Sequence, residues 1–318
     1  MNLDLVARLS CHPIAHDPAA AADLLAGLPG LPPAILPLIG GIAGCSPYLK
    51  DLLRREAGWL RPMLSDPPEA TLATVLAGLD AVPVDQLAQA LRQAKRRVAL
   101  LCALCDCGGV WALAQVTGAL TQLADRAVHL TLTRLVAEEI RRGKLPGARA
   151  EDAETAGGMV ALAMGKLGAG ELNYSSDIDL ICLFDQDRYP DDWQEARTAF
   201  IRVTRKMTAI LSDVSVGGYV FRTDLRLRPD ASVMPVCLSM AAAEAYYEAE
   251  GRTWERAAYI KARPCGGDLA AGARFLAALT PFVWRRHLDF AAIQDAHDMR
   301  LRIRDHRGLN RPLTVEGA

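Results

Sequence analysis

The segment from Met164 to Asp185, MGKLGAGELNYSSDIDLICLFD, constrains the fold and chemistry of this chain more than any other. It follows a short apolar strand over residues 159–164, passes through a glycine-rich turn and enters a second strand that carries Asp177 and Asp179. Because successive strand residues point to opposite faces, two aspartates that flank one isoleucine share a face, about 6.6 Å apart along the backbone. Their carboxylates are therefore placed to converge on shared cations.

A third carboxylate is predicted to join this pair from residues 218–229, GYVFRTDLRLRP. Taken as a strand, the segment presents four charged residues on one face: Arg222, Asp224, Arg226 and Arg228. Mg2+ prefers oxygen ligands, and two ions about 3.5–4 Å apart can hold the attacking and leaving oxygens of a phosphoryl transfer. Asp177, Asp179 and Asp224 therefore predict metal-assisted phosphoryl or nucleotidyl transfer. The alternative is a solvated strand face.

The glycine-rich turn before the aspartates is a candidate phosphate site. GKLGAG is neither a GxxxxGK[ST] phosphate loop nor a GxGxxG dinucleotide turn. Gly165 and Gly168 still allow backbone N–H groups to approach phosphate oxygens closely, and Ser175 or Ser176 adds a hydroxyl donor. Lys166 is a candidate for neutralising phosphate charge. The alternatives are a simple tight turn and a solvated lysine.

Four segments resemble the glutamine synthetase adenylyltransferase family: GKLGAGELNYSSDIDL, FRTDLRLRPD, YYEAEGRTWERAAYIKARP and PFVWRRHLDF. The resemblance implies an α+β fold, in which a nucleotidyltransferase-type mixed β-sheet is flanked by N-terminal and C-terminal helical segments. It implies two Mg2+ ions as cofactors. It also implies that residues 252–263 lie near the nucleotide, where Lys261 and Arg263 would hold phosphate oxygens, as would Arg226 and Arg228. The alternative for these cations is an exposed charged face.

The family is bifunctional, with one half that removes AMP from a tyrosine of glutamine synthetase and another that adds it. The sequence motifs ELNYSSDIDL and PFVWRRHLDF, which follow an N-terminal helical region of about 150 residues, resemble those of the removing half. The resemblance implies phosphorolysis, with phosphate consumed and ADP released, and it implies glutamine synthetase and the PII signal protein as partners. ATP-dependent adenylylation by the same type of site and an inactive fragment that binds either partner remain alternatives. Because family members continue past Ala318, we expect a fragment that is marginally stable and weakly active.

The composition narrows the class of protein. A net charge of −1 gives no basic field for nucleic acid. The uncharged stretch 24–48 is broken as a membrane helix by four prolines, Pro29, Pro32, Pro33 and Pro37, and is expected to be a buried, turn-rich connection. Asp4 lies where a secretory signal would be basic or apolar. Eight cysteines without a disulfide pattern fit a reducing compartment, so a cytoplasmic location is predicted.

Two cysteine-containing groups resemble metal sites only superficially. Cys102, Cys105 and Cys107 form CxxCxC, but they end a helical pattern in which cysteine packs as a small core residue. No second cluster supplies a further ligand at zinc spacing. Cys11 and the two histidines after it, His12 and His16, are not completed by a nearby residue. Core packing is therefore favoured over metal binding for the first group.

The chain is predicted to have three parts. Residues 1–150 are a helical region, in which Asp85 would cap a helix that Gly108 ends; residues 151–265 are the nucleotidyltransferase catalytic domain; and residues 266–318 are a helical C-terminal segment. Within the catalytic domain one apolar stripe predicts a helix: Trp193, Ala196, Phe200, Val203, Met207 and Ile210. An amphipathic helix is expected from Ala291 to His306.

Overall fold

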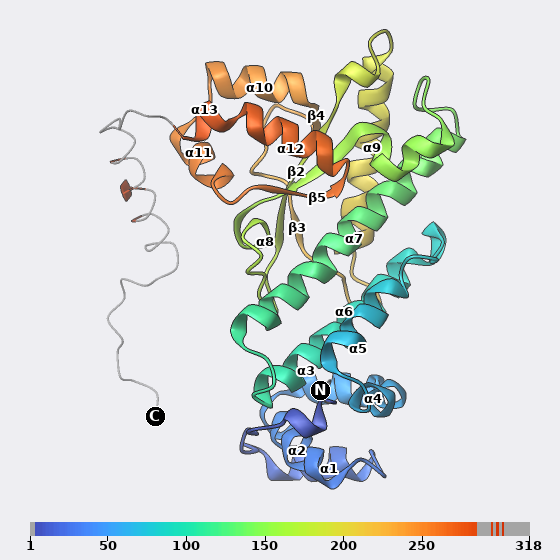
Figure 1. The fold of residues 1–318 in the computed structure, drawn as a ribbon, viewed down its shortest axis with the longest axis vertical. Helices are drawn as coiled ribbons and strands as arrows, with labels where there is room; N and C mark the ends of the chain where they lie inside the picture. The colour runs from blue at the N-terminus through green and yellow to red at the C-terminus, as the bar shows by residue number, and fades with distance from the viewer. Residues whose placement is uncertain (1–3, 285–293, 295–296, 299–300, 302–318) are drawn as a thin grey trace.

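The computed structural model of the protein describes residues 4–284, 294, 297–298 and 301 (Figure 1). The N-terminal region is helical throughout. Its elements are η1 (Val6–Arg8), α1 (Pro18–Ala26), η2 (Pro33–Ile35), α2 (Leu36–Cys45), α3 (Pro47–Arg55), α4 (Ala57–Leu64), α5 (Pro68–Ala77), α6 (Val84–Cys107), α7 (Leu113–Arg141) and η3 (Ala150–Gly158). The long helices α6 and α7 lead from this region toward the sheet.

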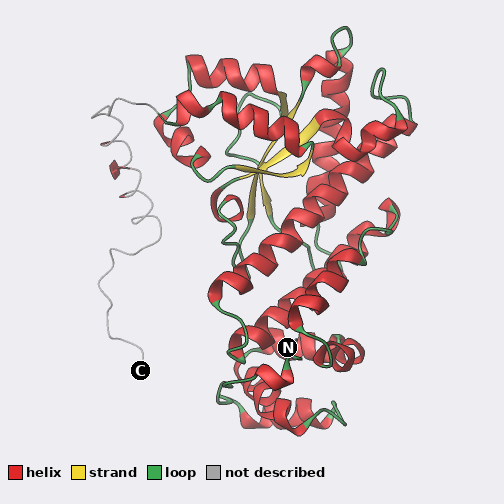
Figure 2. Ribbon diagram, viewed as in Figure 1, coloured by secondary structure: helices red, strands yellow, loops and turns green. Residues whose placement is uncertain are grey.

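The second region holds the strands, with helices around them (Figure 2). Its elements are β1 (Met159–Ala163), α8 (Gly165–Gly168), β2 (Ile178–Phe184), η4 (Gln186–Arg188), α9 (Trp193–Ser212), β3 (Thr223–Asp224), β4 (Cys237–Ser239), α10 (Met240–Ala249), α11 (Thr253–Tyr259), β5 (Arg263–Gly267), α12 (Leu269–Ala278) and α13 (Thr280–Val283). The α+β class predicted from the sequence is confirmed.

The five strands form one mixed sheet in the order β3-β2-β1-β5, with β4 also paired to β2. β1 runs antiparallel to both β2 and β5. β3 and β4 pair in parallel with different parts of β2, at Ile178–Asp179 and at Cys182–Phe184. Because β1 pairs along one edge of β2, the two short strands share the other edge. The mixed sheet is therefore centred on the strand that carries the DID sequence.

Helices cover both faces of the sheet (Figure 1). On one face, Phe184 of β2 stacks on Phe200 of α9 with ring centroids 5.0 Å apart, in a core that continues into α7. On the other face, Ile181 belongs to a second core with Tyr247 of α10 and Phe282 of α13, whose rings lie 5.2 Å apart. Alternate residues of β2 thus enter different cores. Burial on both faces fixes the register of β2, because a slip of one residue would move the side chains of each core into the other.

The proline-rich stretch is more regular than its composition suggested. Residues 24–48 contain α2, so the predicted turn-rich connection is wrong over Leu36–Cys45. Pro37 lies in the first turn of the helix, where the missing N–H costs no helical hydrogen bond. Gly41 permits a close crossing, because a Cβ there would lie 2.0 Å from the carbonyl oxygen of Pro13. The glycine thus lets α2 pack tightly against the extended chain at Pro13.

The predicted cap of α6 is also wrong. Pro83, not Asp85, occupies the N-cap position, since the helix begins at Val84. Asp85 lies in the first turn, where its carboxylate faces the positive end of the helix dipole. The helix ends at Cys107 with Gly108 as the C-cap residue, as predicted.

Other helical predictions are confirmed. The stripe beginning at Trp193 forms α9, which buries Ala196, Phe200, Val203 and Met207. Cys102 and Cys105 are buried in the core. No helix of the described residues is long and apolar enough to cross a membrane. The helix predicted over Ala291–His306 lies outside the described residues, apart from isolated positions, and the PFVWRRHLDF segment is described only to Trp284. The three-part domain division stays a prediction.

Candidate metal and phosphate site

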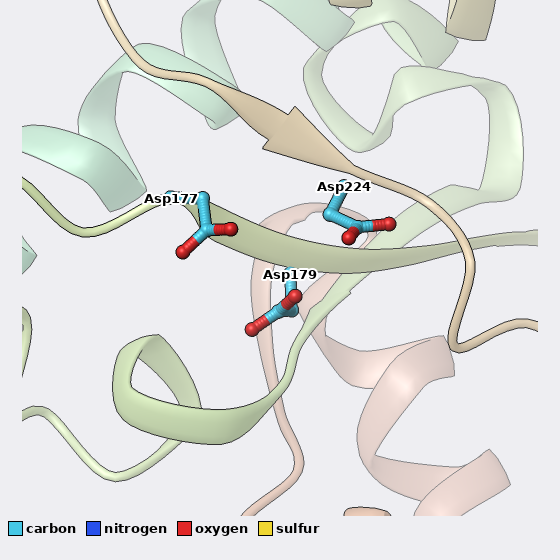
Figure 3. Close-up of side chains that lie close together, drawn as sticks. All are labelled: Asp177, Asp179 and Asp224. Carbon is cyan, nitrogen blue, oxygen red and sulfur yellow. The ribbon is translucent and has the colours of Figure 1, made fainter. Parts of the chain in front are cut away.

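Three aspartates converge where β2 begins (Figure 3). Asp179 belongs to β2, Asp177 immediately precedes it, and Asp224 belongs to β3. The parallel pairing of the two strands sets Asp179 directly opposite Asp224. One carboxylate oxygen from each residue lies within 4.8 Å of the others. The structure therefore brings together the three residues singled out in the sequence; their role as metal ligands stays a prediction.

The triad concentrates negative charge. Burial, followed by the neighbouring carboxylates of Asp177 and Asp224, raises the pKa of Asp179 from 3.8 to about 6. Such a raised pKa shows that the ionised form lacks compensation, which a bound cation supplies. Three convergent oxygen donors also match the preference of hard divalent ions. The residues present therefore fit Mg2+.

One arginine already neutralises part of this charge. The Nε of Arg226 donates to both carboxylate oxygens of Asp224, at 3.0 and 2.9 Å. These hydrogen bonds lower the pKa of Asp224, in contrast to that of Asp179. The arginine side chain is 84% exposed, so it has room to leave the carboxylate when a metal ion or phosphate arrives. The ionised form of Asp224 is thus stabilised by a cation of the protein itself.

The alternating strand predicted over residues 218–229 is wrong outside Thr223–Asp224. β3 has only two residues, because the side chain of Asp224 accepts a hydrogen bond from the backbone N–H of Arg226 at 2.8 Å and turns the chain. Arg228 does not continue the charged face. Its guanidinium donates to the carbonyl oxygens of Leu225 and Ala231, at 2.7 and 2.8 Å, and so holds the following loop.

The glycine-rich turn contains a single helical turn, α8, beside the triad. Gly165 has a φ of +54°, and a Cβ at this position would lie 3.1 Å from Oδ2 of Asp179. Gly168 is packed closely against backbone, because its Cβ would lie 2.1 Å from the carbonyl oxygen of Lys261. Lys166 is exposed on α8. Glycine therefore keeps side-chain atoms out of the space next to the aspartates.

The remaining candidate phosphate residues differ in how they are engaged. Lys261 pairs with Glu171 at 3.2 Å, between side chains that are 52% and 64% exposed. Arg263 is held more firmly, by Asp125 and by the carbonyl oxygen of Leu167, both at 2.9 Å. It therefore anchors β5 to α7 and α8.

Ser175 and Ser176 lie in the segment leading to Asp177, the first exposed and the second partly buried. The carbonyl oxygen of Ser175 accepts a hydrogen bond from Arg222. The phosphate roles assigned to the serines, Lys261 and Arg263 stay predictions.

A mixed sheet with two aspartates at the start of one strand and a third on its parallel neighbour has the form of a nucleotidyltransferase. Residues 37–278 match the glutamate-ammonia ligase adenylyltransferase family, and the chain belongs to that family. The resemblance noted in the sequence is therefore confirmed, as is membership of a nucleotidyltransferase family.

Individual relatives agree with this assignment. The chain is 45% identical over 339 residues to a bifunctional glutamine synthetase adenylyltransferase/adenylyl-removing enzyme of Rhodopseudomonas palustris, covering 99% of this chain and 34% of the relative. It is 49% identical over 308 residues to one of Bradyrhizobium sp., covering 95% and 31%, respectively. A third, from Xanthobacter autotrophicus, is 47% identical over 282 residues, covering 87% and 28%. The chain spans about a third of the length of these relatives.

Proposed function

We propose that this chain removes AMP from an adenylylated tyrosine of glutamine synthetase by phosphorolysis. The observation that carries the proposal is the convergence of Asp177, Asp179 and Asp224 within 4.8 Å in a chain of this family. The removing direction is supported by the ELNYSSDIDL wording. Glutamine synthetase as substrate is supported by the names of the relatives.

The reaction exchanges one phosphorus–oxygen bond for another. An oxygen of inorganic phosphate attacks the phosphorus of the tyrosine-bound AMP, and the bond from that phosphorus to the tyrosine oxygen breaks. ADP leaves, and the tyrosine hydroxyl is restored. No covalent protein intermediate is required, because phosphoryl-type transfer depends mainly on positioning and charge stabilisation.

The carboxylates would hold the metal, and the nearby cations would hold phosphate. Asp177 and Asp179 would bind two Mg2+ ions, and Asp224 would share one and orient the nucleophile. The ions would supply charge stabilisation for the attacking and leaving oxygens. Arg226, which is largely exposed beside Asp224, is placed to exchange that carboxylate for a phosphate oxygen. Gly165 keeps the approach to Asp179 free of a side chain.

The setting of the reaction belongs to the same proposal. We infer a cytoplasmic enzyme regulated through the PII signal protein, with phosphate and ADP as its small-molecule partners and with neither nucleic acid nor membrane as a partner. The cysteines support a reducing compartment, because all eight are free thiols in the described structure. The net charge of −1 is consistent with a protein rather than a nucleic acid substrate.

A second candidate is ATP-dependent adenylylation, in which the tyrosine oxygen attacks the α-phosphorus of ATP and pyrophosphate leaves. This candidate is supported by the names of the relatives, which state both the adenylyltransferase and the adenylyl-removing activity. The same three carboxylates would serve, since both directions transfer an adenylyl group. A third possibility is an inactive fragment that only binds glutamine synthetase or PII.

Parallel assays separate these candidates. Purified chain is incubated with adenylylated glutamine synthetase, Mg2+ and phosphate, and intact-protein mass spectrometry follows the loss of AMP while chromatography follows ADP. A second reaction supplies unmodified glutamine synthetase, Mg2+ and ATP. Loss of AMP with matching ADP supports removal, whereas gain of AMP only in the second reaction reverses the direction. Absence of both reactions, with binding retained, favours the inactive fragment. Asp179→Asn serves as the catalytic control.

A further inference from the structure

A pocket of about 600 Å³ lies between the helical region and the segments that lead to the aspartates. It is lined by parts of α3 and α6, by Tyr174 and Ser175, and by the turn at residues 215–219. Small-molecule sites commonly have volumes of roughly 300–1,000 Å³. The pocket is therefore large enough for a compound of nucleotide size.

Two cations in its lining have no carboxylate partner within the described residues. The Nζ of Lys95 donates to the carbonyl oxygen of Val220 at 2.8 Å and lies 3.9 Å from the centroid of the Phe221 ring. Arg92 donates through Nη2 to the carbonyl oxygen of Asp213 at 3.0 Å, while its buried Nε has no hydrogen-bond partner. Both side chains thus carry positive charge that no carboxylate of the described residues neutralises.

The other two lining arginines are already paired. Arg55 bonds to Asp51 at 2.8 Å, and Arg96 bonds to the nearly buried Glu56 at 2.8 Å. The lining arginines Arg55 and Arg96 thus each have a carboxylate partner. Arg92 and Lys95 have no carboxylate partner in the described structure. These two residues are separated by one turn of α6 and therefore lie on the same side of the helix.

The uncompensated charge is costly without a ligand. Burial, together with the positive charge of Arg222, lowers the pKa of Lys95 from 10.5 to about 8. An anion in the pocket would relieve both effects, because it replaces lost solvation and opposes the neighbouring guanidinium. The arrangement of Arg92 and Lys95 is therefore better explained by a site for an anion than by a contribution to stability.

We propose that this pocket binds a phosphate-bearing small molecule without a metal ion. A phosphate group carries close to two negative charges, which matches the two unpaired cations. Three tyrosines, Tyr48, Tyr174 and Tyr219, also line the pocket and offer ring surfaces to a planar base. Inorganic phosphate and a nucleotide share this chemistry.

An occupant would touch the chain just before one triad aspartate, and the residues that it touches are bonded to an arginine just before another. Ser175 lines the pocket and precedes Asp177 by two residues, a separation of at most about 7 Å along the chain. Arg222 precedes Asp224 by two residues, and it bonds to the carbonyl oxygen of Ser175 and to the hydroxyl of Tyr219, the latter at 3.0 Å. The pocket is thus physically coupled to the candidate catalytic site, whichever direction the reaction takes.

The test is isothermal titration calorimetry of the full 318-residue chain in EDTA, with ADP in one arm and inorganic phosphate in the other. We expect binding at one site, weakened at least about tenfold in Arg92→Gln and in Lys95→Gln, because each loses a charge-assisted hydrogen bond worth roughly 1.5–3 kcal/mol. Arg205→Gln is the control: this exposed arginine of α9 lies outside the pocket, and the variant should bind normally. Circular dichroism checks that each variant is folded.

The ligand arms distinguish the source of the phosphate. Tight binding of ADP with weak binding of phosphate assigns a nucleotide, and equal binding assigns the bare anion; either supports the pocket if both variants weaken it. Failure of both ligands to bind, or binding unaffected by Arg92→Gln and Lys95→Gln, overturns the proposal, as would binding only of an acidic peptide. Asp179→Asn should retain metal-free binding, so loss of catalysis and loss of this pocket are separable.

Discussion

The triad and the cationic pocket adjoin the same short segment but carry opposite charge. On the triad side, three carboxylates share a single arginine, Arg226, which is largely exposed. On the pocket side, Arg92 and Lys95 face the cavity without a carboxylate in the described structure. Among the described residues, the triad is only partly neutralised by positive charge, and the two pocket cations have no negative partner. The comparison teaches that one fold can hold an acidic and a basic cluster apart by the few residues around Ser175.

The largest expected effect is loss of catalysis on the triad side. Asp177→Asn or Asp179→Asn removes an anionic metal ligand, so the rate of AMP transfer should fall at least about 100-fold, on the scale of catalytic charge stabilisation. Phosphate-dependent ADP release measures the effect. Asp191→Asn, an exposed aspartate away from the triad, should retain the normal rate. A wild-type rate in both triad variants would contradict the proposal that these aspartates bind the metal.

Steric disruption of the glycine turn should damage the triad side alone. In Gly168→Ala, the new Cβ would meet the backbone carbonyl oxygens of Lys261 and Ala163 at 2.1 and 2.7 Å. Because backbone atoms cannot move away as a flexible side chain could, we expect the free energy of unfolding to fall by about 1–3 kcal/mol and the activity to decrease. Gly58→Ala in α4 meets nothing within 4 Å and should stabilise the chain by roughly 0.5–1 kcal/mol. Urea denaturation compares the two; equal stability would contradict the tight packing of α8.

Magnesium should stabilise the chain in a pH-dependent manner. Burial and then the neighbouring carboxylates raise the pKa of Asp179 from 3.8 to about 6. Its favourable contribution is therefore complete below pH 3.8 and is lost as pH rises through about 6, when a half-buried carboxyl ionises beside like charges. Mg2+ offsets that repulsion. We expect a rise of a few degrees in melting temperature at pH 7.5 and almost none at pH 5.

Differential scanning fluorimetry with and without Mg2+ measures this shift across the pH range. Asp179→Asn should largely abolish the response at pH 7.5. A magnesium shift that is equally large at pH 5, or that persists in this variant, would place the ion elsewhere. Metal-free binding of ADP or phosphate in the cationic pocket should be unchanged by the same substitution.

The smallest expected effect concerns the arginine that shields Asp224. Arg226→Gln removes a competing cation, so the apparent affinity for Mg2+ should rise by no more than about fivefold, since solvent screens an ion pair this exposed. At the same time the phosphate concentration for half-maximal rate should increase. Arg205→Gln on α9, also exposed, is the control. Unchanged values for both ligands would show that Arg226 acts only locally on Asp224.

The sequence predicted best what depends on short spacing. Asp177 and Asp179 could be paired because strand geometry fixes residues two apart, and α9 could be predicted from one continuous apolar stripe. The extent of β3 could not, because the side chain of Asp224 competes for the backbone N–H of Arg226 and ends the strand. A two-residue periodicity contains no information about that competition.

The cationic pocket was missed for a different reason. Its lining comes from α3, α6 and a turn more than one hundred residues further along the chain, and no local motif joins them. The available signal was the basic spacing of Arg92, Lys95 and Arg96 on one helix, which equally describes a solvated face. Only the packing of α6 against the turn at 215–219 distinguishes an enclosed charge from an exposed one.

The placement of α7 bears on how this protein can be divided in the laboratory. The helix precedes the predicted boundary at residue 150, yet it packs against α9 and β5, and a single apolar cluster runs from Leu5 to Cys265 through it. Gly266 of β5 lies so close that a Cβ there would be 2.9 Å from the backbone nitrogen of His129. An expression clone starting at residue 151 would lack the helix that packs beside α9 on one face of the sheet, whereas one starting at α7 would retain it.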